Sequence, residues 1–129
     1  MENNLTISEL KDMQLKLYER NKEKWNDMEP KYAKDHILYM VEEIGECISI
    51  IKKKKIDNIM DDAKIRNRFI EEMSDVLMYY IEVLNRLDIS AEEFSEVYME
   101  KYHTNLNRDY VEENKKKYEQ RWACWMKKW

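Results

Sequence analysis

The chain has 129 residues, a mass of 16.0 kDa and a formal net charge of −4, from 27 acidic and 23 basic side chains. This length fits one domain, and a core of that size is stable without disulfides or bound metals. The chain holds one glycine and one proline, where an average chain of this size carries about 15 of the two together. Glycine-rich phosphate loops are therefore excluded, and sandwich and barrel folds are disfavoured.

The charge balance indicates which partners to expect, and the N-terminal sequence indicates in which cellular compartment the protein acts. The acidic balance gives no general attraction to nucleic acid polymers. The sequence MENNLTISELKDM lacks a basic region followed by an apolar run, so we expect no signal peptide. No uncharged apolar stretch approaches the about 18 residues of a membrane span. Cys47 and Cys124 lie in apolar helical contexts, and we interpret them as free, buried thiols of a cytoplasmic protein.

Hydrophobic periodicity predicts an all-α, up-and-down helical bundle in a single domain over residues 1–129, with four core helices and a C-terminal helical tail. Thr6 with Glu9, and Ser90 with Glu93, fit capping boxes that open two of the helices. Apolar residues spaced three and four apart form a seam on the second helix and another on the third, suited to packing against other helices. The predicted helices span about 7–27, 33–54, 63–87, 90–104 and 108–129.

Two acidic motifs interrupt these apolar helices. Residues three apart share one face of a helix, so Glu43 pairs with Glu46, and Glu72 pairs with Asp75. A solvated acidic face usually carries Lys or Arg four residues further on, but Cys, Ile, Val and Tyr occupy those positions here. Only Arg68, four residues before Glu72, offers a local counter-charge.

Neighbouring acidic residues add to the repulsion. Glu42 with Glu46, and Glu71 with Asp75, are like charges at a spacing that destabilises a helix by a few tenths of a kcal/mol each. One explanation is a pair of ordinary charged surface patches. The other is a shared metal site, and oxygen-only ligands favour Mg²⁺ or Mn²⁺.

The pattern Glu-Glu-x-x-Glu followed on the next helix by Glu-x-x-Asp resembles the signature of the all-α nucleoside triphosphate pyrophosphohydrolases. These are the MazG-like proteins, with the dimeric dUTPases and dCTP pyrophosphatases as relatives. The segments MVEEIGECISIIKK and FIEEMSDVLMYYIEVL are similar to whole helices of that family. The resemblance covers about residues 25–110 and leaves the tail, about 111–129, outside it.

The resemblance implies Mg²⁺-dependent hydrolysis of an NTP or dNTP between the α- and β-phosphates, with Mn²⁺ as a substitute metal. Its implied metal ligands are Glu43, Glu46, Glu72 and Asp75. Glu71 and Glu42 would lie beside the metal. Either Glu42 or Glu46 could take the proton of the attacking water, and the sequence does not choose between them.

The resemblance also implies contacts to the nucleotide. Lys101-x-x-x-Asn105-x-x-Arg108 stands where MazG-like enzymes carry a Lys/Asn/Arg set, with Lys101 and Arg108 meeting phosphate and Asn105 the base or sugar. Trp25 stands where family members often place an aromatic ring near the base. The competing interpretations are a basic helix end for the set and a core side chain for Trp25. His36 and His103 are interpreted as plain polar residues.

Partners are predicted from the same resemblance. The family assembles as dimers or tetramers, so we expect a homodimer or homotetramer, and no membrane partner. Trp122, Trp125 and Trp129 share one face of the tail helix, interpreted as packing on the bundle or on a second subunit. The main alternative to an enzyme is a helical scaffold whose acidic patch docks a basic partner.

Overall fold

A computed structural model describes residues 4–128 and places helices, but no strand, within that range. The helices are α1 (Ile7–Asn21), a short 3₁₀ helix η1 (Pro30–Tyr32), α2 (Ala33–Asp61), α3 (Ala63–Arg86), α4 (Ala91–Leu106) and α5 (Tyr110–Met126). The all-α class predicted from composition and periodicity is confirmed. None of the helices within 4–128 is both long and apolar enough to cross a bilayer.

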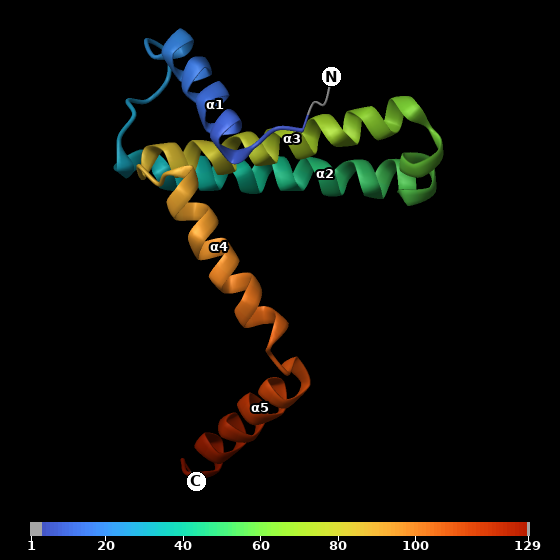
Figure 1. The fold of residues 1–129 in the computed structure, drawn as a ribbon. Helices are drawn as coiled ribbons and strands as arrows, with labels where there is room; N and C mark the ends of the chain where they lie inside the picture. Colours follow the sequence, from blue (N-terminus) through green and yellow to red (C-terminus); the bar gives the residue numbers. More distant parts are fainter. Residues whose placement is uncertain (1–3, 129) are drawn as a thin grey trace. The chain divides into compact units, whose positions relative to one another are not determined.

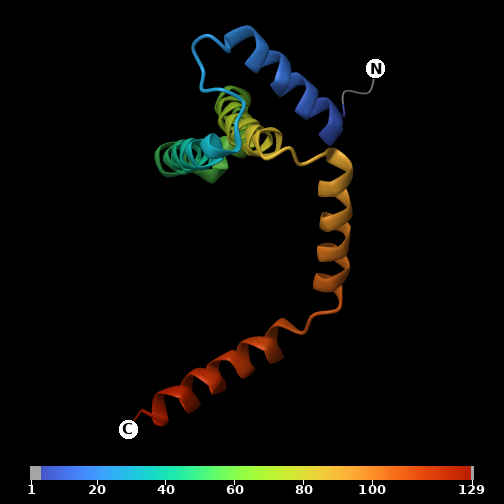
Figure 2. The ribbon, with the colours of Figure 1, turned by 90° about the vertical axis from the view of Figure 1, so that its left-hand side faces the viewer.

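The chain forms two compact units, one ending at Ala91 and the other beginning at Glu92. In the first unit, α2 and α3 run antiparallel along each other, and α1 packs on α3 (Figures 1 and 2). The Lys11 ammonium donates to Asn85 Oδ1 at 2.7 Å, and the Asn85 amide donates to the Lys11 carbonyl at 3.2 Å. These two bonds fix α1 against the end of α3. The second unit contains α5 and all of α4 except its first residue.

The start of α1 follows the predicted capping box, whereas its end does not follow the prediction. Glu9 N–H donates to Thr6 Oγ1, and Thr6 N–H donates to the Glu9 carboxylate, as the sequence indicated. The helix ends at Asn21 rather than near residue 27. In the segment that follows, the carbonyls of Asn26 and Asp27 accept from the Arg86 guanidinium of α3. A tertiary contact therefore holds residues that were expected to extend the helix.

The end predicted for the second helix agrees with a break in α2, but the segment after the break differs from the prediction. The helix was expected to stop near residue 54 and give way to a polar connection. It breaks at Lys55, which has φ 70° and ψ 154°, and the expected connection is instead helical as far as Asp61. Ile59 in this last stretch is 6% exposed. Its burial anchors a segment that looked too polar to be structured.

The apolar seam predicted on the second helix does not form the packing face of α2 within the first unit. Ile37, Val41, Ile44 and Ile48 of the predicted α2 seam are all exposed, and α2 buries His36, Cys47 and Ile50 among others. The two faces differ because α2 packs on α3 through Cys47 and its neighbours: Cys47 Sγ lies 3.6 Å from Met73 Sδ. The first unit by itself therefore leaves an apolar face of α2 uncovered.

The cysteine interpretation holds for one thiol only. Both cysteines are free, but Cys47 is buried whereas Cys124 is exposed. Cys124 lies on α5, which has no buried residue among those described.

Candidate functional site

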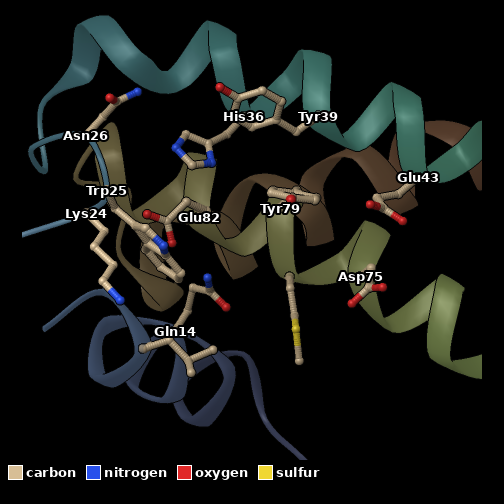
Figure 3. Close-up of a pocket in the computed structure, with 12 residues that line it drawn as sticks. Gln14, Lys24, Trp25, Asn26, His36, Tyr39, Glu43, Asp75, Tyr79 and Glu82 are labelled. Atoms are coloured by element: carbon tan, nitrogen blue, oxygen red, sulfur yellow. The ribbon is translucent and has the colours of Figure 1, made fainter. Parts of the chain in front are cut away.

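Carboxylates from α2 and α3 meet where the two helices pack. One oxygen each of Glu43, Glu72 and Asp75 lies within 4.8 Å of the others. Figure 3 shows Glu43 on α2 and Asp75 on α3 at the same end of a cavity. The antiparallel pairing of two helices that each carry acids three residues apart brings these groups together. Three of the four predicted metal ligands therefore form one cluster.

The cluster is electrostatically strained. Burial raises the pKa of the Glu43 carboxyl, and hydrogen bonding with Glu72 and the negative charges of Asp75, Glu72 and Glu46 raise it further. Burial, followed by the charges of Glu72 and Glu43, also raises the pKa of the Cys47 thiol. Like charges at this separation favour a shared proton or a cation. The donors are all oxygens, which suits Mg²⁺ or Mn²⁺.

Glu46, the fourth predicted ligand, lies outside this group of three. It lines a second cavity with Ser49, Ile50 and Ile65 and with four basic side chains, which are Lys53, Lys54, Lys64 and Arg68. Its negative charge still acts on Glu43. Glu42 and Glu71 are exposed, and the Glu71 carboxylate accepts from the Asn67 amide at 2.9 Å. The acidic motifs therefore contribute three carboxylates to the compact cluster, and their other three, Glu42, Glu46 and Glu71, are exposed.

A cavity of about 520 Å³ leads away from the cluster (Figure 3). Its volume falls in the range usual for small-molecule sites. Glu43 and Asp75 line one end, and the rest of the lining combines four aromatic rings with polar and apolar side chains. The rings of His36, Tyr39 and Tyr79 lie 5.4 to 6.1 Å apart between centroids. Trp25, from the segment after α1, lines the same cavity and is 37% exposed.

The segment that carries Trp25 is held by a buried ion pair. Arg86 Nε donates to Glu82 Oε1 at 3.0 Å, and both side chains are at most 1% exposed. The other guanidinium nitrogens donate to the carbonyls of Asn26 and Asp27. The Met28 N–H donates to the Tyr18 hydroxyl at 3.0 Å. Together these bonds place Trp25 at the cavity.

His36, Tyr39, Tyr79 and Glu82 were not among the predicted site residues. Their sequence signal is helical: His36 and Tyr39 stand seven and four residues before Glu43, while Tyr79 and Glu82 stand four and seven after Asp75. Each set therefore continues a carboxylate face by one or two turns. Burial, together with the positive charge of Arg86, lowers the pKa of His36, which keeps its ring neutral at pH 7.

The predicted Lys/Asn/Arg set belongs to the second unit. Arg108 donates to the Glu113 carboxylate at 2.9 Å and to Asn105 Oδ1 at 3.5 Å. The hydrogen bond from Arg108 lowers the pKa of Glu113 most, and the positive charges of Arg108, Lys117 and Lys101 lower it further. Arg108 is thus paired with a carboxylate that α5 supplies, and Asn105 is bonded to Arg108.

The tail tryptophans lie in this unit as well. The rings of Trp122 and Trp125 meet edge to face at 5.5 Å, and both side chains are about half exposed. Trp129 lies outside the described residues.

An antiparallel helical pair with a carboxylate cluster at one end of an aromatic cavity defines the class, an all-α protein with a candidate divalent-cation site. Residues 33–108 match the model of the MazG nucleotide pyrophosphohydrolase domain. The chain therefore belongs to the MazG nucleotide pyrophosphohydrolase domain family. No curated protein and no solved structure matches it.

Proposed function

We propose that the protein is a Mg²⁺-dependent nucleoside triphosphate pyrophosphohydrolase that clears unwanted NTPs or dNTPs. The observation that carries this proposal is the continuity of Glu43 and Asp75 with an aromatic cavity, inside the segment that matches the family model. The cavity offers room and rings for a nucleoside, and the carboxylates offer a place for a cation beside its phosphates. A scaffold needs neither feature.

In this reaction, a water oxygen bonds to the α-phosphorus, and the bond from that phosphorus to the α,β-bridging oxygen breaks. Pyrophosphate leaves with the electron pair, and the nucleoside monophosphate stays. A bound Mg²⁺ would neutralise phosphate charge and make water a better nucleophile. Glu43, Glu72 and Asp75 would hold the cation, with Glu46 the predicted fourth ligand. Glu71 would lie beside it.

The remaining proposed roles fall to other side chains. Glu42 or Glu46 would accept the proton of the attacking water, since both are exposed and ionisable. Trp25 would stack on the base. Lys101 and Arg108 would contact phosphate and Asn105 the base or sugar, with phosphate competing against Glu113 for Arg108.

The test is a product assay with ribo- and deoxynucleoside triphosphates, in Mg²⁺ and separately in Mn²⁺. We expect monophosphate and pyrophosphate in equal amounts, with no diphosphate or free phosphate. Glu72→Gln should reduce kcat by about a hundredfold or more, because it removes one of few ligands for the cation. The matched control is Asp57→Asn, an exposed carboxylate on α2 outside both cavities, which should act like the wild type. Intact nucleotides under both metals would favour the scaffold instead.

A further inference from the structure

Two buried side chains line the cavity away from the carboxylate cluster, and each keeps one polar atom unbonded. Glu82 is 1% exposed and His36 is 8% exposed. Within the described chain, neither Glu82 Oε2 nor His36 Nδ1 has a hydrogen-bond partner. Both side chains line the cavity, and Figure 3 shows them next to each other between α2 and α3. Unbonded buried polar atoms are costly and rare in native proteins, so these two indicate a polar ligand.

The Glu82 carboxylate is held in one orientation. Its Oε1 accepts from Arg86 Nε at 3.0 Å. The two remaining guanidinium nitrogens already donate to the carbonyls of Asn26 and Asp27. The rings of Tyr18 and Tyr32 lie 5.8 and 6.0 Å from the guanidinium carbon. No nitrogen of Arg86 is bonded to Glu82 Oε2 in this arrangement, so that oxygen stays available as an acceptor.

The position of this acceptor suits a nucleotide. Asp75 and Glu82 are seven residues apart on α3, and His36 and Glu43 are seven apart on α2. Seven residues of α-helix rise about 10 Å. A nucleoside with its α-phosphate at the carboxylate cluster would therefore bring its base to Glu82 and His36. The rings of Trp25, Tyr39 and Tyr79 line the same cavity.

Building on the pyrophosphohydrolase function proposed above, we propose that Glu82 and His36 read the edge of the base and select one with an exocyclic amino group: cytosine, adenine or guanine. A carboxylate paired with arginine only accepts hydrogen bonds. An exocyclic amino group supplies the matching donor. Uracil and thymine offer only an N3–H between two carbonyl oxygens, and a carboxylate repels those oxygens. The neutral His36 ring accepts or donates the second bond.

The experiment compares kcat/KM of the wild-type protein for ATP, GTP, CTP and their deoxy forms with that for UTP, dUTP and dTTP. Uracil and thymine cannot donate the charge-assisted hydrogen bond to Glu82. We therefore expect kcat/KM to be about tenfold or more higher for the bases that carry an exocyclic amino group. Glu82→Gln should reverse this order. Its amide oxygen can still accept from Arg86, while its amide nitrogen turns a donor toward the cavity.

His36→Phe is the second variant, since it keeps a flat ring and removes both nitrogens. It should reduce the preference severalfold while leaving the stabilisation by Mg²⁺ unchanged. Asp57→Asn is the control and should keep the wild-type preference. The two variants distinguish a change in base preference from a general loss of the site. If Glu82→Gln does not fold, the comparison of substrates with the wild-type protein still tests the predicted base preference.

The outcomes separate this inference from the proposed function. Equal hydrolysis of all the nucleotides, or a wild-type preference for uracil or thymine, would overturn base reading by Glu82 and leave the pyrophosphohydrolase function intact. Failure to hydrolyse any nucleotide would overturn the function, and base reading with it. Amino-base preference that Glu82→Gln reverses would establish both.

Discussion

The residue that reports most directly on the candidate metal centre is Glu43. Its pKa is raised above the ordinary value because burial, Glu72, Asp75 and Glu46 all disfavour its negative charge. A carboxyl whose pKa is higher in the folded state than in the unfolded state contributes most to stability below its ordinary pKa of 4.5. That contribution is lost as the pH rises through the folded pKa. At neutral pH the metal-free cluster therefore weakens the fold.

Glu43→Gln should for this reason raise the melting temperature of the metal-free protein at pH 7.5, by a few degrees at most. The gain should disappear near pH 4, where the wild-type carboxyl is protonated in both states. Mg²⁺ at a hundredfold excess over its Kd should stabilise the wild type by about 2.7 kcal/mol, and Glu43→Gln should reduce that gain. Thermal unfolding with EDTA and with Mg²⁺ at both pH values measures these effects.

Asp57→Asn is the matched control, since it removes an exposed charge of α2 away from the cluster. It should keep the response to Mg²⁺. Equal melting temperatures for the wild type with EDTA and with Mg²⁺ or Mn²⁺ would contradict a cation site at Glu43.

The sequence indicated part of this site and missed the rest for identifiable reasons. Spacing of three residues predicted the acidic pairs, and the structure brings Glu43, Glu72 and Asp75 together. The same rule grouped Glu46 with them, but a helix face is wide, and Glu46 faces a cavity lined by basic residues. Glu82 was not among the predicted site residues, although it continues the Asp75 face of the helix. In the structure its burial and its ion pair with Arg86 single it out.

At the scale of the elements, Arg86 joins α3 to the segment between α1 and η1. The ion pair with Glu82 is fully buried, and two backbone carbonyls of that segment depend on the same guanidinium. Removing one partner of such a pair leaves the other charge buried and uncompensated. The placement of Trp25 at the cavity therefore depends on a side chain of a different helix.

Arg86→Met should lower the free energy of unfolding by about 3–5 kcal/mol, because Glu82 loses its counter-charge. The double variant Glu82→Leu with Arg86→Met should lose clearly less, since no unpaired charge remains buried. Urea unfolding followed by circular dichroism measures both. Equal losses in the single and double variants would mean that Arg86 acts through the carbonyls of Asn26 and Asp27 alone.

Helix existence was predictable here, whereas helix ends and packing faces were not. A capping box is a local signal, and the one at Thr6 and Glu9 forms as expected. The segment after α1 is held by Arg86, which lies about 60 residues further along the chain, and the stretch of α2 after its break at Lys55 buries Ile59. Periodicity showed that α2 has an apolar seam but could not say whether this chain or another covers it.

At the scale of the whole molecule, the uncovered seam bears on assembly. On α2, Val41 is 57% exposed and Ile48 is 52% exposed, and on α3, Ile70 is 50% exposed. Isolated exposed apolar residues are ordinary, but a row at helical spacing is typical of an interface. The homodimer or homotetramer predicted from the family resemblance would bury such a row, with helices packing through interleaved apolar side chains.

We therefore expect light scattering after size exclusion to give a mass of at least twice the chain's 16.0 kDa. The double variant Val41→Lys with Ile48→Lys should shift the protein toward a monomer, because a dimer would have to bury two charges from each chain without partners. Val111→Lys, at an exposed apolar position of α5, is the control and should keep the wild-type mass if α2 carries the interface. A wild-type protein that stays monomeric at high micromolar concentration would contradict self-association, and dissociation by Val111→Lys alone would move the interface to α5.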